Sequence, residues 1–214
     1  NTTEALNIAA QFIAGEVKGD AEPVVLNTLM EHNSNELPWR YHFGLTHLRL
    51  HVDDEGFVDL RELEALLREY NQAHAHGKQR IQLVAVSGES NVLGAFNDLA
   101  AISSLAHRFG ARVLVDAAQR AAHRRVEMKA WNIDYLAFSA HKMYAPFGSG
   151  GLVVRHSLRT PDVDEFARYQ ASGAENAAGI AALGKAMLLL RRIGLDVIEE
   201  EERALTRRAL QGLS

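Results

Sequence analysis

The chain has 214 residues, of which 47% are hydrophobic and 23% are charged, a composition that suits a soluble globular protein with one substantial core. The formal net charge of -4 excludes a strongly basic surface, and no apolar run approaches the roughly 20 residues of a membrane helix, so we expect no nucleic-acid partner, no membrane partner and a cytoplasmic location. The absence of cysteine excludes disulfides, thiolate metal sites and a cysteine nucleophile within these residues.

The first predicted element is a helix over residues 1–13, because polar capping residues precede apolar residues at helical spacing. Short apolar runs then predict strands at 24–26, 46–50, 81–86, 112–115, 133–138 and 151–154. Amphipathic patterns predict helices at 59–70, 99–109 and 177–193, and Gly110 and Gly194 stand where the last two need a left-handed stop. This alternation predicts an α/β fold of three layers, with helices on both faces of a mostly parallel sheet.

Both ends of the chain are abrupt. A helix begins within the first four residues, and the acidic run 199–202 enters a helical pattern that continues to the last residues. We therefore expect the chain to be a fragment of a longer protein.

Polar residues are concentrated directly after the predicted strands. They lie at 31–32, 90–91, 116–119 and 139–142. Ligands of open α/β sheets collect at the carboxyl ends of the strands. The sequence therefore predicts a binding site at this edge of the sheet.

Lys142 is the first candidate for chemistry at this edge. It follows a buried strand, and partial desolvation there favours the neutral amine that attacks aldehydes and forms Schiff bases. The alternative is a surface lysine in a glycine-rich loop, since most lysines are exposed.

Asp116 ends another predicted strand. A carboxylate in that place can pair with the protonated pyridine nitrogen of a cofactor and keep the ring an electron sink. The alternative is a helix cap, because aspartate after a strand often caps the next helix.

Thr2 and Thr3 begin the first helix, where free N–H groups, the helix dipole and the hydroxyls attract an anion such as phosphate. Simple capping is the alternative. His32 could stack on a cofactor ring or be a loop histidine without a partner. The spacing of His32, His123 and His141 provides no paired metal ligands, so we predict no metal site.

Five segments together resemble the class V aminotransferase and cysteine desulfurase family, whose members use pyridoxal 5'-phosphate (PLP). They are residues 2–7, 31–39, 90–94, 115–119 and 138–142, which occur in the family's order and with similar spacing. The resemblance covers nearly the whole chain. It implies the large domain of a fold type I PLP enzyme, with a three-layer, mostly parallel sheet of the seven-stranded type.

The resemblance also implies roles for single residues. Lys142 would hold PLP through a Schiff base, Asp116 would pair with the pyridine nitrogen and His32 would stack over the ring. The other implied contacts are Thr2, Thr3, Ser139 and His141 to the phosphate, Gln119 to the phenolate oxygen, and Asn91 near the ring and substrate.

The implied function is a PLP-dependent enzyme that acts on an amino acid, aminotransferase-like or cysteine desulfurase-like, assembled as a homodimer. Residues 1–192 would form the PLP-binding domain without its N-terminal segment, and 193–214 a helix leading to a small domain absent from this chain. Ala174 stands where family members often carry a threonine that reaches the neighbouring subunit's phosphate, so we do not expect that contact.

Two other functions are weighed against this one. A non-catalytic or truncated PLP-fold domain that serves in assembly would have no chemical need for Lys142, Asp116, Gln119 and His32 together. A nucleotide-binding domain is disfavoured because the glycine cluster 148–151 precedes a strand, whereas a phosphate-gripping loop leads into a helix.

Overall fold

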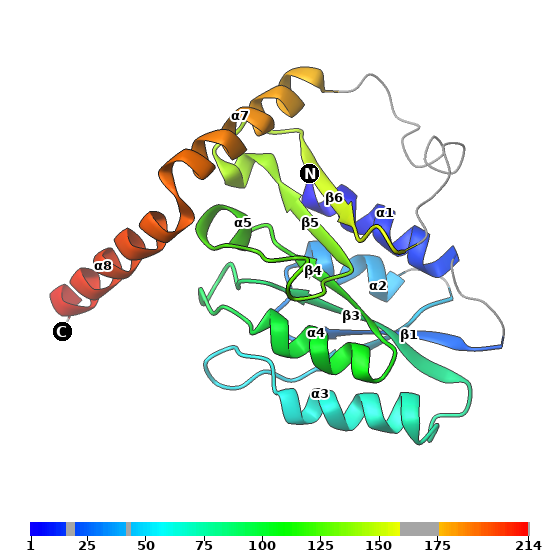
Figure 1. Ribbon diagram of the computed structural model, residues 1–214. Coiled ribbons are helices and arrows are strands. Elements are labelled where there is room, and N and C mark those ends of the chain that lie inside the picture. The colour runs from blue at the N-terminus through cyan, green and yellow to red at the C-terminus, as the bar shows by residue number, and fades with distance from the viewer. Residues whose placement is uncertain (16–19, 42–43, 159–175, 214) are drawn as a thin grey trace.

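The structure is a computed structural model that describes residues 1–15, 20–41, 44–158 and 176–213 (Figure 1). Its centre is one sheet of six strands in the order β2-β1-β3-β4-β5-β6. The strands are β1 (Glu22–Thr28), β2 (Thr46–Leu50), β3 (Gln79–Ser87), β4 (Arg112–Asp116), β5 (Tyr135–Ser139) and β6 (Gly150–Val154). The first five strands run parallel to one another, whereas β6 is antiparallel to β5. All six predicted strands are therefore present.

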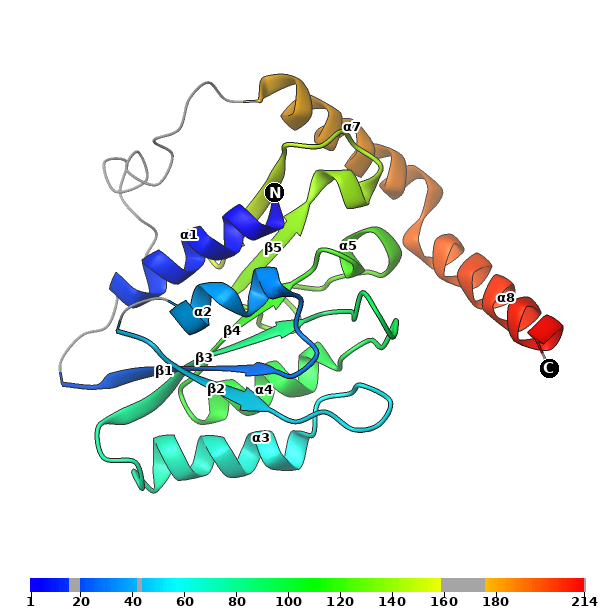
Figure 2. The same cartoon turned by 180° about the vertical axis from the view of Figure 1, so that it is seen from behind.

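Helices cover both faces of this sheet. The helices α1 (Thr2–Gly15) and α2 (Leu37–Tyr41) lie on one face, and α3 (Leu60–Leu67) and α4 (Leu99–Arg108) lie on the other (Figures 1 and 2). Successive residues of a strand pack into two different hydrophobic cores, one on each face of the sheet, because side chains alternate between the two faces. Val24 and Leu26 pack in the α3–α4 core, whereas Val25 packs in the α1–α2 core. The three-layer, mostly parallel architecture is confirmed.

The predicted helix over 59–70 is confirmed at its start and differs in its last turn. Asp59 is its N-cap and accepts hydrogen bonds from the N–H groups of Arg61 and Glu62. After Leu67 the chain widens into a π-helical turn, η2 (Arg68–Gln72), which buries Tyr70. The apolar spacing alone does not distinguish this wider turn from an α-helix.

The last two elements of the chain are long helices. The helix α7 (Ala177–Ile193) ends at Gly194, whose φ of 90° lies in the region that favours glycine. The helix α8 (Leu195–Leu213) then projects away from the sheet (Figure 1) and has no buried residue. None of the helices in the described ranges combines the length and apolarity needed to cross a bilayer.

Short turns join the carboxyl ends of three strands to the elements that follow. They are η1 (Asn33–Asn35) after β1, α5 (Arg120–His123) after β4 and η3 (Ala140–Met143) after β5. Parallel strands direct these turns to a single edge of the sheet. The amino end of α1 reaches the same edge, where Thr2 contacts Ser139 at the end of β5.

Gly150, at the start of β6, is a position where a side chain should not fit. A Cβ there would lie 2.5 Å from the carbonyl oxygen of Phe138 and 2.9 Å from the Cα of Asn1, and both are backbone atoms. We expect Gly150→Ala to lower the free energy of unfolding by about 1 to 3 kcal/mol, because β6 must shift away from β5. Thermal and denaturant unfolding of the full-length protein would measure this.

Gly184, in the middle of α7, is the matched control. A Cβ there meets nothing within 4 Å. Gly184→Ala should stabilise the protein by roughly 0.5 to 1 kcal/mol, because alanine favours a helix over glycine. Equal effects of the two substitutions would contradict the proposed crowding at Gly150.

Candidate active site

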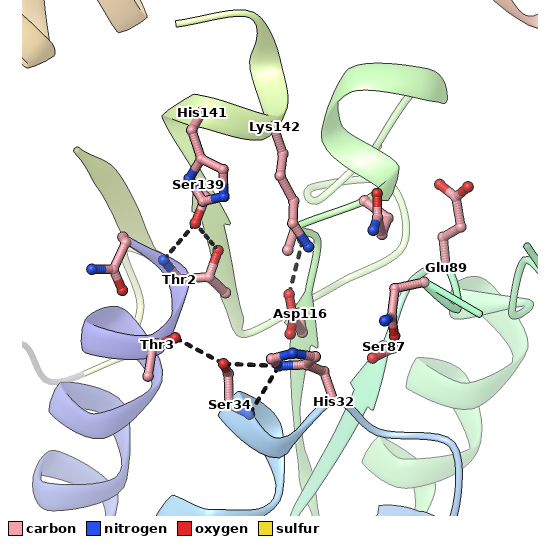
Figure 3. Close-up of a pocket in the computed structure, with 14 residues that line it drawn as sticks. Thr2, Thr3, His32, Ser34, Ser87, Glu89, Asp116, Ser139, His141 and Lys142 are labelled. Carbon is pink, nitrogen blue, oxygen red and sulfur yellow. Dashed lines mark hydrogen bonds between the residues drawn. The ribbon is translucent and has the colours of Figure 1, made fainter. Parts of the chain in front are cut away.

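A cavity of about 240 Å³ opens at the carboxyl edge of the sheet (Figure 3). All nine residues predicted for the site line it, although they come from widely separated parts of the sequence. They are Thr2, Thr3, His32, Asn91, Asp116, Gln119, Ser139, His141 and Lys142. The geometry brings the predicted set together, and the role of each residue stays a prediction.

Lys142 and Asp116 occupy the centre of the cavity. Lys142 lies in η3, is half-buried, and extends its side chain toward Asp116 (Figure 3). Asp116 is buried at the end of β4. The alternative of an exposed loop lysine is therefore not what the structure shows.

The carboxyl group of Asp116 is poorly solvated. Burial raises its pKa, while the N–H of Ala118 and the charges of Lys142 and His32 act in the opposite direction. The N–H of Ala118 donates to Oδ1 of Asp116 at 2.8 Å, and this hydrogen bond closes a local turn. The residue at the N-cap of α5 is Gln119 and not Asp116. Asp116 therefore does not cap that helix, and a cation placed against it would favour its charged form.

The amino end of α1 and the end of β5 meet on one side of the cavity. The N–H and hydroxyl of Thr2 lie 2.7 and 2.6 Å from the Ser139 hydroxyl. The helix is capped by Asn1, whose Oδ1 accepts the N–H of Glu4 at 3.1 Å, so Thr2 and Thr3 are helical residues and not the cap. Their hydroxyls and the helix dipole suit an anion at this end.

His141 belongs to the same side of the cavity. Its ring stacks on Phe147 with centroids 4.8 Å apart. Its buried Nδ1 has no hydrogen-bond partner among the described residues. A buried ring nitrogen without a partner suits a site that a ligand atom completes.

His32 lies across the cavity from these residues and is oriented by Ser34. The backbone N–H of Ser34 donates to His32 Nδ1 at 3.1 Å, so Nδ1 accepts and the neutral ring carries its proton on Nε2. The Ser34 hydroxyl lies 2.9 Å from the same nitrogen and 2.7 Å from the Thr3 hydroxyl. Ser34 thus joins two predicted site residues, as Figure 3 shows.

Glu31, which directly precedes His32, holds the same loop in place through hydrogen bonds. Its carboxylate accepts hydrogen bonds from the side chains of Thr28, Asn35 and Ser87, and from the N–H of Ser87. Burial raises the pKa of Glu31 and outweighs these donors. The group therefore ties the start of η1 to the end of β3 and fixes the position of His32.

Arg120 was not predicted, and it fixes the loop that carries Asn91. Its guanidinium donates to the carbonyl oxygens of Gly88 and Asn97, at 3.1 Å each. It also lies over the rings of Phe96 and Trp131, 5.6 and 5.2 Å from their centroids. One side chain therefore closes the loop at both of its ends.

We expect Arg120→Ala to lower the free energy of unfolding by about 1.5 to 3 kcal/mol, the range for charge-assisted hydrogen bonds. Proteolysis between residues 88 and 97 should also become faster, because that loop loses its anchor. Arg125→Ala is the control: its side chain is 61% exposed and makes surface ion pairs, so the cost should be at most about 1 kcal/mol. Similar losses in both variants would show that Arg120 does not anchor the loop.

Three further expectations concern features with no direct part in this geometry. Ala174 lies outside the described residues. Across the parts of the chain that the structure describes, no three His, Asp or Glu side chains are gathered closely enough to hold a metal ion. The glycine cluster 148–151 leads into β6, as the argument against a nucleotide loop requires.

Comparison with known proteins gives a consistent result. The family described as Aminotransferase class-V matches residues 1–214. A cysteine desulfurase of Dickeya dadantii is 35% identical over 237 aligned residues, which cover 100% of this chain and 55% of that protein. A probable cysteine desulfurase of Halalkalibacterium halodurans is 32% identical, with 100% of this chain and 55% of that protein covered.

Solved structures agree with these relatives. The cysteine desulfurase of Thermococcus onnurineus superposes with a TM-score of 0.82 at 30% identity, covering 100% of this chain and 56% of that one. The Escherichia coli cysteine desulfurase CsdA gives a TM-score of 0.81 at 26% identity, covering 99% and 56%. The chain therefore spans little more than half the length of the proteins that it matches.

Proposed function

The chain belongs to the class V aminotransferase family, and from that premise we propose that it forms the cofactor-binding part of a PLP-dependent enzyme that acts on an amino acid. Between the two activities that the sequence suggests, we propose cysteine desulfuration. The support is that the relatives and solved structures named above are cysteine desulfurases. Because this chain has no cysteine, a thiol that accepts sulfur would come from elsewhere in the protein.

The single observation that carries this proposal is the placement of Lys142 beside Asp116 in one cavity. PLP requires an amine that bonds its aldehyde and a carboxylate that faces its ring nitrogen. An anion-binding region at one end is the third requirement. Thr2 and His141 offer donors there, and the buried Nδ1 of His141 still lacks a partner among the described residues.

We assign the residues to the cofactor as follows. Lys142 would hold PLP through a Schiff base, Asp116 would face the ring nitrogen, and His32 would stack on the ring. The remaining contacts would be Thr2, Thr3, Ser139 and His141 to the phosphate, Gln119 to the phenolate oxygen, and Asn91 beside the ring.

PLP, when bound, withdraws electrons from the α-carbon of an amino acid and so acidifies its proton. Lys142 would accept that proton on Nζ and return it, since its amine lies in the centre of the cavity. Asp116 would hold the ring nitrogen in its charged form. Because the Nδ1 of His32 accepts the N–H of Ser34, its Nε2 would be the nitrogen that can donate a proton to a group above the ring.

We also propose that the protein is a cytoplasmic homodimer. The family resemblance suggests the dimer, and large apolar side chains are exposed along α7, among them Ile180, Leu188 and Leu189. Size-exclusion chromatography with light scattering would measure the assembly. A monomer at micromolar concentration would contradict the dimer.

The function is tested with full-length protein, PLP and cysteine. With a thiol reductant present, we expect alanine and sulfide to form in equal amounts. Formation of a keto acid that depends on an added amino acceptor would instead identify an aminotransferase. A protein that binds no PLP would contradict both, and would favour a non-catalytic role in assembly.

A further inference from the structure

Glu89 lies at the end of the cavity away from the predicted phosphate site. It follows β3 in the loop that Arg120 closes, and it lines the cavity together with Lys142. Figure 3 places Thr2 and Ser139 on one side of Lys142 and Glu89 on the other. With PLP held by Lys142 and its phosphate toward Thr2 and Ser139, as proposed above, the space near Glu89 would be left for the amino acid substrate.

One oxygen of the Glu89 carboxyl group is buried without a partner: Oε2 makes no hydrogen bond in the part of the chain that the structure describes. Burial raises the pKa of Glu89, and the nearby charges of His123 and Arg124 only partly offset this. Such a group favours a ligand that brings a hydrogen-bond donor or a positive charge.

The neighbouring basic side chains are already engaged. Arg124 pairs with Glu199 and Glu202 of α8, and His123 bonds Glu202. Arg120 donates to two backbone carbonyl groups. None of these basic side chains makes an ion pair with Glu89 within the described residues.

Three carboxylates lie close together here, on Glu89, Glu199 and Glu202, and they differ in their partners. Arg124 pairs with Glu199 and Glu202, and Arg203 also pairs with Glu199, whereas Glu89 makes no ion pair within the described residues. Only Glu89 of the three carboxylates lines the cavity. An anionic side chain on the substrate would meet repulsion there.

We propose that Glu89 selects the substrate side chain, favouring one that donates a hydrogen bond and rejecting one that is anionic. This inference rests on the proposed function, because it needs PLP in the cavity to position the amino acid. Within that function it names a substrate class: amino acids whose side chain is neutral or cationic and carries a donor.

The test uses asparagine and aspartate, which share their shape and differ in charge. Their dissociation constants are measured with the full-length PLP-bound protein by titrating its visible spectrum. We expect the parent protein to bind asparagine at least about tenfold more tightly than aspartate. Glu89→Gln, which keeps the size of the side chain, should lower that preference by about tenfold.

Glu127→Gln is the control, since Glu127 is exposed and does not line the cavity. It should leave the preference unchanged. If Glu89→Gln binds PLP normally but keeps the parental preference, or if both variants lose it equally, the inference is wrong. If the parent protein itself binds no PLP, the proposed function fails, and this inference fails with it.

Discussion

Lys142→Ala should abolish covalent retention of PLP and lower turnover by at least about 10²- to 10⁴-fold, the contribution of a positioned acid or base. The reason is that this amine, which lines the cavity, can both bond an aldehyde and move a proton. The variant should still bind PLP reversibly, because the predicted phosphate contacts are unchanged. Borohydride reduction followed by peptide mass mapping would measure the bond directly.

Lys129→Ala is the control for this experiment, because Lys129 is exposed and does not line the cavity. In the parent protein and in this control, reduction should attach the cofactor to the peptide that contains Lys142. Attachment to a different lysine would contradict the site. Full turnover by Lys142→Ala would contradict the mechanism.

The inner strands β1, β3, β4 and β5 were predictable because each contains a short apolar run whose two faces are both covered. In β3 every residue from Leu83 to Val86 is buried and apolar, so the sequence shows a continuous apolar run that needs no tertiary information. Boundaries were harder to predict. The polar residues Gln79 and Arg80 belong to β3 because they pair with β1, and that pairing has no local signal.

The candidate site was predictable in outline because the topology of the sheet collects the residues that follow parallel strands. Lys142 and Asp116 were therefore identified from their positions after two strands. Ser34 and Glu89 were not, because their significance depends on neighbours that folding supplies. Ser34 bonds Thr3, which lies 31 residues earlier, and the neighbours of Glu89 include Glu202 of α8.

Arg120 illustrates the same limit for the loop. In the sequence it is one of several arginines near residue 120, and nothing local distinguishes it from the exposed Arg125. The distinction arises because its guanidinium reaches carbonyl oxygens 32 and 23 residues away. Interactions of this kind follow from the fold and cannot be inferred from spacing along the chain.

Asp116→Asn should leave the fold and PLP binding largely intact while turnover falls on the order of 10²- to 10³-fold. Asparagine keeps the size of the side chain and can accept the Ala118 N–H, but it has no charge to hold the ring nitrogen protonated. Because burial raises the pKa of Asp116, its carboxylate form is costly by itself and is stabilised by a cationic partner. Steady-state kinetics and PLP titration would separate turnover from binding.

Asp98→Asn provides the comparison, because Asp98 is an exposed N-cap of α4 and asparagine caps a helix about as well. It should retain parental turnover and stability. The ring-nitrogen role predicts that Asp116→Asn loses turnover at every pH at which the parent is active, since asparagine does not titrate. Parental turnover in Asp116→Asn would show that this carboxylate does not hold the ring nitrogen, even if Lys142 carries the cofactor.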